Sequence, residues 1–116
     1  MKIKNKQITF TLEDDMHLHI AIGMLMKMGE GIKINKSEYI RDSLLTNFEI
    51  FEDELKSDNI EQLAKLSKVF VGTKPLTVTL PIEVIEKLEY YSEKLGMKKS
   101  HLVMCSLLLD EEKEEE

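Results

Sequence analysis

Small polar side chains alternate with large apolar ones in two short segments of this chain. Thr9–Leu12 reads TFTL and Thr77–Leu80 reads TVTL. Neighbouring side chains of an extended strand point to opposite faces, so each segment predicts one polar and one apolar face. Gln7 extends the polar face of the first segment. Hydroxyl and amide groups donate and accept hydrogen bonds, which suits recognition of a polar surface. The structural alternative is that the threonines serve only as good strand formers facing solvent.

The other polar residues do not form a set that predicts catalysis. His17 and His19 are two positions apart, so on a helix they face different directions and make a poor metal pair. The sequence has no Gly-rich phosphate loop, no Cys/His metal spacing and no defensible Ser–His–Asp set. We expect no enzyme activity, no metal site and no cofactor. The lone Cys105 lies in an apolar helical pattern, which favours a buried thiol and a reducing compartment.

Each alternating segment is followed by two helical patterns, so one strand–helix–helix motif occurs twice. Gly29–Gly31 breaks the first helix and Gly96 ends its counterpart. Asn35 or Ser37 is expected to cap the second helix, and Ser100 the last one. The expected elements are strands over 6–12 and 75–80 and helices over 14–29, 37–55, 82–95 and 100–112.

Neither copy can bury its strand and helices alone, because a single strand leaves backbone groups unpaired. We therefore expect Gln7–Leu12 and Pro75–Leu80 to pair as an antiparallel ribbon, with the four helices on its apolar face. The fold class is mainly α with a two-stranded antiparallel β-ribbon. The expected divisions are a first copy over 1–56, a helical connector over 57–72, a second copy over 73–110 and an acidic tail over 111–116.

The first helix is apolar nearly all round and rich in methionine, which predicts burial on more than one side. Its surplus apolar faces have two possible uses. They could pack on the connector, or they could drive assembly between chains.

The net charge of −6 is unevenly distributed. Residues 1–47 hold seven basic and six acidic side chains, and residues 73–109 hold five and four. The acidic excess lies in 48–72 and in the tail, so both copies are slightly basic. Nucleic-acid affinity depends on local phosphate contacts rather than total charge, so the overall charge does not exclude it. The tail is interpreted as a solubilising end or as a binding site for a basic partner.

The second copy, LTVTLPIEVIEKLEYYSEKLGMKKSHLVMCSLL, resembles the ribbon–helix–helix (MetJ/Arc/CopG) superfamily of DNA-binding regulators. The first copy, QITFTLEDDMHLHIAIGMLM followed by NKSEYIRDSLL, resembles it more loosely. It carries about five extra residues in its first helix and turn. The resemblance implies that this single chain forms the paired unit that relatives build from two subunits.

The resemblance also implies a set of DNA contacts in the major groove. The implied base-contacting residues are Gln7, Thr9, Thr11, Thr77 and Thr79. Glutamine pairs with adenine, and threonine offers a hydroxyl and a methyl group. Pro75 replaces the long basic or amide residue that the family often carries, which predicts weaker contact from the second strand.

The family directs the N-terminus of each second helix at a DNA phosphate, an anion site formed by free N–H groups and the helix dipole. The implied phosphate-contacting residues are Lys6, Lys36, Ser37, Lys74, Lys99 and Ser100. The alternative is ordinary helix capping beside surface lysines. The basic start with Lys2, Lys4 and Lys6 either follows the DNA backbone or is a solvated terminus.

The resemblance implies that the protein binds specific sequences of double-stranded DNA. It would do so as a transcriptional repressor or activator. Two or more such units are expected to bind DNA together. The tandem arrangement resembles that of small viral or plasmid regulators. No run of 18 apolar residues and no signal peptide is evident, so we expect a cytoplasmic protein without a membrane partner. One rival is an antitoxin-like module that holds a protein partner through 48–72 or the acidic tail. Another is a structural helical protein that never meets DNA.

Overall fold

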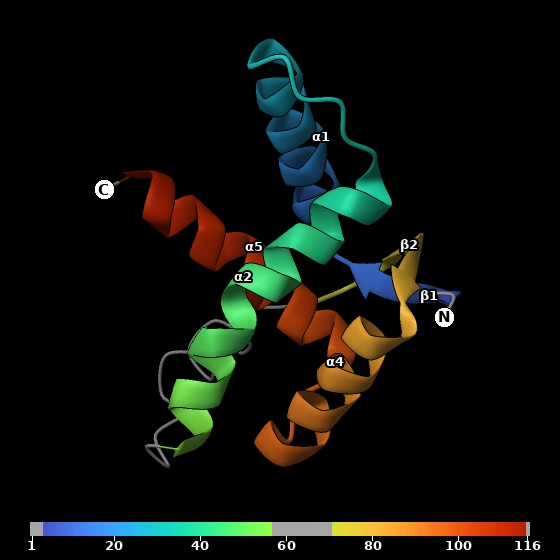
Figure 1. Ribbon diagram of the computed structural model, residues 1–116, viewed down its shortest axis with the longest axis vertical. Helices are drawn as coiled ribbons and strands as arrows, with labels where there is room; N and C mark the ends of the chain where they lie inside the picture. The colour runs from blue at the N-terminus through green and yellow to red at the C-terminus, as the bar shows by residue number, and fades with distance from the viewer. Residues whose placement is uncertain (1–3, 57–70, 116) are drawn as a thin grey trace.

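The computed structural model describes residues 4–56 and 71–115, with side chains as far as Glu111. Within these ranges the chain is mainly helical, with a single two-stranded sheet (Figure 1). Each half contributes a strand followed by two helices. The elements are β1 (Asn5–Leu12), α1 (Asp14–Gly29), α2 (Lys36–Lys56), β2 (Lys74–Pro81), α4 (Ile82–Leu95) and α5 (Lys99–Glu115).

The two strands pair in the antiparallel sense, as the alternating segments predict. Thr9 lies opposite Thr77, and Phe10 lies opposite Leu76. Phe10 and Leu76 are buried while both threonines are exposed. Because directly opposed residues share a face, the ribbon has one apolar face toward the helices and one polar face toward solvent.

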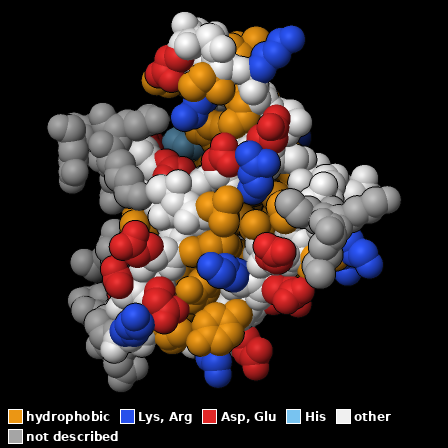
Figure 2. Space-filling view, viewed as in Figure 1, with side chains coloured by type: hydrophobic (Ala, Val, Ile, Leu, Met, Phe, Trp, Pro, Cys, Tyr) orange, Lys and Arg blue, Asp and Glu red, His pale blue; other side chains and the backbone are white. Residues whose placement is uncertain are grey.

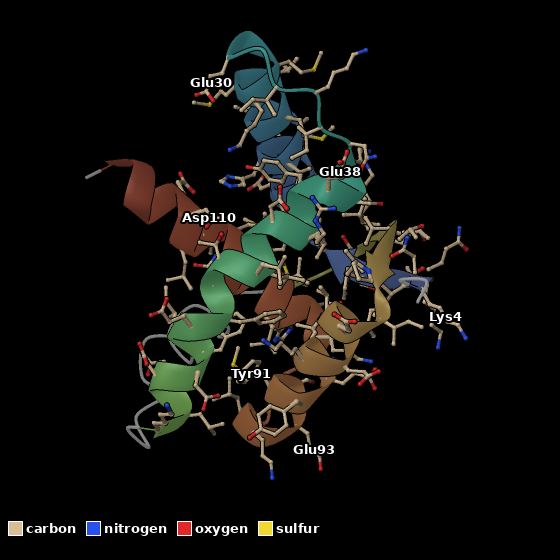
Figure 3. All side chains as sticks on the ribbon, viewed as in Figure 1. Lys4, Glu30, Glu38, Tyr91, Glu93 and Asp110 are labelled. Atoms are coloured by element: carbon tan, nitrogen blue, oxygen red, sulfur yellow. The ribbon has the colours of Figure 1, made fainter. Side chains whose placement is uncertain are left out.

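The helices pack against the apolar face of the ribbon and form one shared core with it. α2 and α5 cross at the centre of the molecule, and α1 and α4 extend from it in opposite directions (Figure 1). A single cluster of buried side chains joins both strands to all four helices. The predicted inner residues of α4 are all buried, namely Val84, Ile85, Leu88, Tyr91 and Leu95. Tyr91 packs edge-on against Phe51 and donates a hydrogen bond to Glu52 of α2 (Figure 3).

A buried polar network lies where α2 crosses α5. Ser43 and Ser106 are hydrogen-bonded through their hydroxyls at 2.7 Å. Asn47 Nδ2 donates to Asp110 Oδ1 at 2.9 Å, and Ser43 donates to Asp110 Oδ2 at 2.6 Å. Asp110 projects from α5 toward this crossing (Figure 3). The network satisfies polar groups that would otherwise be costly to bury.

The structure corrects three expectations. Only Met16 and Ile20 of α1 are fully buried, so this helix is buried on one side rather than several. Its apolar periodicity could not show how many of its sides the described elements cover. Ser100 lies inside the first turn of α5 rather than at its cap, because the helix begins at Lys99. α5 also continues through the acidic tail to Glu115, consistent with the good helix propensity of Glu and Lys.

Other expectations are met or lie outside the described ranges. Asn35 caps α2, and Gly96 ends α4 in the left-handed conformation with φ 68°. The connector expected over 57–72 lies outside the described residues except for Val71 and Gly72, which are not helical. None of the helices in the described ranges is both long and apolar enough to cross a membrane.

Candidate nucleic-acid interface

The outer face of the ribbon brings together the five residues predicted to contact bases. Gln7 lies opposite Thr79, Thr9 opposite Thr77, and Thr11 opposite Pro75. All six side chains are exposed. The face therefore carries hydroxyl, amide and apolar groups at fixed spacing, without a charged side chain between them.

The central threonines form a hydrogen-bonded pair. The Oγ1 atoms of Thr9 and Thr77 are 2.8 Å apart. One hydroxyl donates to the other, so the pair keeps one free O–H donor, several acceptor lone pairs and two methyl groups for a partner. This contact holds both rotamers in place at the middle of the face.

Asn5 is an additional residue of the outer face that the sequence analysis missed. β1 begins at Asn5 rather than Lys6, and Asn5 lies opposite Pro81. The odd-numbered alternation through 7, 9 and 11 extends to this position and could have revealed it. Its amide adds a donor and an acceptor at one end of the face.

Ser37 and Ser100 contact the ribbon from the two second helices. The backbone N–H of Thr79 donates to Ser37 Oγ at 2.9 Å, and that of Thr11 donates to Ser100 Oγ at 2.9 Å. A two-stranded sheet leaves an unpaired edge on each strand, and these hydroxyls accept one N–H from each edge. Each serine therefore accepts a hydrogen bond from the strand that belongs to the other half of the chain. Each hydroxyl also retains its own hydrogen for a further acceptor.

Shallow hollows flank the ribbon at these serines, and two of them are similar in size. One, of about 350 Å³, is lined by Asn35, Ser37 and Thr79 among others. The other, of about 340 Å³, is lined by Thr9, Lys99 and Ser100 among others. Each hollow joins a helix N-terminus to the edge of the outer face, where the phosphates beside a bound groove would lie.

The two helix N-termini differ in charge. At the start of α2, Asn35 and Glu38 exchange reciprocal hydrogen bonds, a capping box that places a carboxylate in the first turn. The first turn of α5 contains no acidic residue; it begins at Lys99 and is preceded by Lys98. Lys98 lines the hollow beside α5 and was not in the predicted phosphate set. The α5 end is therefore the better anion site.

Lys6 and Lys74 occupy matching places at the two ends of the ribbon. Lys6 lies opposite Leu80, and Lys74 lies opposite Leu12. Their side chains thus belong to the helix-facing side of the ribbon, but both are exposed. They flank the outer face instead of forming part of it. Lys4, at the same end as the N-terminus, is also exposed (Figure 3).

His17, His19 and Cys105 are not part of the outer face, whereas His101 lines a hollow together with Thr11 of that face. The ring Nε2 of His17 is 3.0 Å from the carbonyl of Lys74, and His19 faces Glu111 at 3.7 Å. Burial raises the pKa of the Cys105 thiol to about 12, so it stays protonated. Within the described ranges no group of three His, Cys, Asp or Glu side chains is arranged to hold a metal ion.

No protein-family model matches this chain, and neither curated proteins nor solved structures show detectable similarity to it.

Proposed function

We propose that this protein is a sequence-specific, double-stranded DNA-binding regulator of the ribbon–helix–helix type. In this proposal its two copies form an internal pseudo-dimer. The observation that carries the proposal is the outer face of the ribbon, which is exposed, polar, uncharged and flanked by lysines on both sides. The hydrogen bonds that Ser37 and Ser100 accept, each from the other copy's strand, support the paired arrangement.

The dimensions and chemistry of the ribbon match a major groove. Paired strands lie about 5 Å apart, and a B-form major groove about 12 Å wide accepts a two-stranded ribbon. Gln7 can contact adenine through both amide atoms, and the methyl groups of Thr9 and Thr77 suit thymine methyls. Pro75 holds the place in the second copy that Gln7 holds in the first, and its ring offers no amide group there, so the two half-contacts are unequal.

Phosphate contacts in this proposal come from the ribbon ends and the helix N-termini. Lys6 and Lys74 supply one pair, and Lys36 and Lys99 supply the other beside Ser37 and Ser100. Few basic residues are involved, so one unit binds modestly and several units act together on one operator. A regulator of this kind works where DNA is accessible, in the cytoplasm of its host.

Selection from random duplex DNA tests the proposal directly. The full chain should enrich a short preferred site, and its affinity should fall as salt rises because phosphate contacts release counterions. The measurement is fluorescence anisotropy with selected and scrambled duplexes at several salt concentrations. Absence of any enriched sequence, together with no salt-sensitive binding, would exclude DNA as the partner.

A further inference from the structure

α1 carries most of the exposed large apolar side chains of the described chain. Five of the nine residues in this class lie on it, each exposing between 49% and 65% of its surface. They are Leu18, Ile22, Leu25, Met26 and Met28. Figure 2 shows hydrophobic side chains at the surface of the end of the molecule where α1 projects. Monomeric proteins rarely leave so much contiguous apolar surface uncovered.

Three of these side chains and Gly29 form a straight stripe, which we call the α1 stripe. It comprises Leu18, Ile22, Leu25 and Gly29, with spacings of four, three and four residues. At 3.6 residues per turn these positions fall within about 60° of one another. The buried Met16 and Ile20 lie on the opposite side of the helix. Lys27 also falls opposite, so the stripe carries no charge.

The comparison with α4 shows that a helix at this position in the fold does not need an apolar outer surface. α4 follows β2 as α1 follows β1, yet its exposed side is mainly charged. Its exposed residues are Glu83, Glu86, Lys87, Glu89, Tyr90, Glu93 and Lys94. The apolar stripe is thus a property of α1 itself and not of its place in the architecture.

The stripe is complementary to itself when reversed. Its spacing reads the same in both directions, so an antiparallel copy places Ile22 opposite Leu25 and Leu18 opposite Gly29. Apart from its chain neighbours and the nearby backbone of α1, no atom lies within 4 Å of a Cβ built on Gly29, so there is open space at that position for a leucine. Paired helices usually insert side chains that repeat every three or four residues into the spaces between side chains of the partner helix. We propose that two copies of this chain associate through α1 as an antiparallel helix pair about a twofold axis.

Charge and area agree with this arrangement. Asp14 and Asp15 begin α1, so a parallel pair would bring four carboxylates together, whereas an antiparallel pair keeps them at opposite ends. Covering the five exposed side chains on each copy removes roughly 1,000 Å² of surface in total, the lower limit for a specific interface. The dimer is therefore expected to be reversible and concentration-dependent. The flexible methionines at the edges can adapt to a partner helix.

Sedimentation equilibrium of the full chain without DNA tests the proposal. Over about 1 to 500 µM, a range suited to a small interface, the average mass should rise from one chain to two. Leu25→Lys should weaken association at least tenfold. Leu45→Lys is the matched control, because Leu45 is 50% exposed on α2, outside the stripe. It should leave association unchanged, and circular dichroism should show both variants folded.

Gly29→Leu distinguishes a specific antiparallel helix pair from non-specific hydrophobic association. It adds apolar surface, so non-specific association would strengthen, but a pair that seats Leu18 over Gly29 would be weakened at least tenfold. A wild-type chain that stays monomeric throughout, or a Leu45→Lys loss equal to that of Leu25→Lys, overturns the proposal. So does stronger association in Gly29→Leu. Because no DNA is present, this result is independent of DNA binding.

Discussion

Gln7 is the outer-face side chain with the longest reach and with both a donor and an acceptor. We expect Gln7→Ala to cost about 1–3 kcal/mol of binding at the selected site, with little change on scrambled DNA. Anisotropy titrations on both duplexes measure the difference. Thr46→Ala, at an exposed position of α2, is the control and should leave both affinities unchanged. An equal loss on both duplexes would mean that Gln7 does not read sequence.

Thr9→Ala should reduce binding at the selected site as Gln7→Ala does, with little effect on the stability of the fold. It removes one hydroxyl of the Thr9–Thr77 pair and leaves the other without that partner. Both residues are exposed, so water can replace the lost bond and unfolding stability should change little.

The polar network between α2 and α5 places unlike residues at matching positions. Asn47 and Asp110 each lie ten residues after the serine that contacts the ribbon, and an amide there donates to a carboxylate. Two carboxylates at these positions would repel each other and leave Ser106 without its amide donor.

We therefore expect Asn47→Asp to destabilise the fold by about 3 kcal/mol, as for other broken buried polar pairs. Asp110→Asn keeps a hydrogen-bonding partner and should cost only about 1 kcal/mol. Urea unfolding followed by circular dichroism compares them. Equal losses in the two variants would contradict a role for the donor–acceptor match.

The N-termini of α2 and α5 are equivalent in position but not in electrostatics. Lys99→Ala should lower the slope of log affinity against log salt by about one unit on any DNA. Lys36→Ala should have a smaller effect, because Glu38 already opposes an anion at α2. Glu38→Gln keeps a capping side chain, removes the charge and should strengthen binding. Unchanged slopes in both lysine variants, with the fold intact, would remove the helix N-termini from DNA binding.

Gly72 joins the connector to β2 where no side chain fits. A Cβ on Gly72 would meet the carbonyl oxygen of Thr11, which belongs to the backbone of β1 and cannot rotate away. Gly72→Ala should therefore lower unfolding stability by about 1–3 kcal/mol. Thr73→Ala is the neighbouring control and should be close to neutral, since Thr73 is exposed. A neutral result for Gly72→Ala in thermal unfolding would show that the two segments separate easily.

At the scale of the whole molecule, both strands of the ribbon come from one chain. Thr9→Cys combined with Thr77→Cys should therefore crosslink within a chain, because these positions are directly opposed. Cys105 is fully buried and protonated, so it should not compete. Mass spectrometry after oxidation or treatment with a short bismaleimide distinguishes the products. Predominant interchain crosslinks at low protein concentration would indicate that chains exchange strands.

Self-association through α1 would place two ribbons in one particle. A dimer of this kind would be expected to occupy two sites with cooperative binding. Leu25→Lys would then reduce cooperativity on DNA while leaving the affinity of one unit unchanged. This consequence rests on both proposals, so the sedimentation and selection experiments come first.

Much of the architecture follows from local pattern. The period of two in TFTL and TVTL and the three-and-four spacing of Val84, Ile85 and Leu88 are properties of neighbouring residues. They correctly predict strands, helices and most buried positions, because a strand or helix must turn its apolar residues toward a core. The pairing of the strands also follows, since neither copy could satisfy its backbone alone.

The tertiary structure decided the contacts between residues far apart in the chain. That Ser100 accepts from Thr11, and that Asn47 faces Asp110, depends on how the two halves cross, which no local period encodes. The exposure of α1 was likewise unpredictable from its composition. A helix apolar on all sides is buried only if enough elements surround it, and the described elements cover one side of α1. Periodicity determines which residues share a face, whereas the spatial arrangement of the elements determines what that face meets.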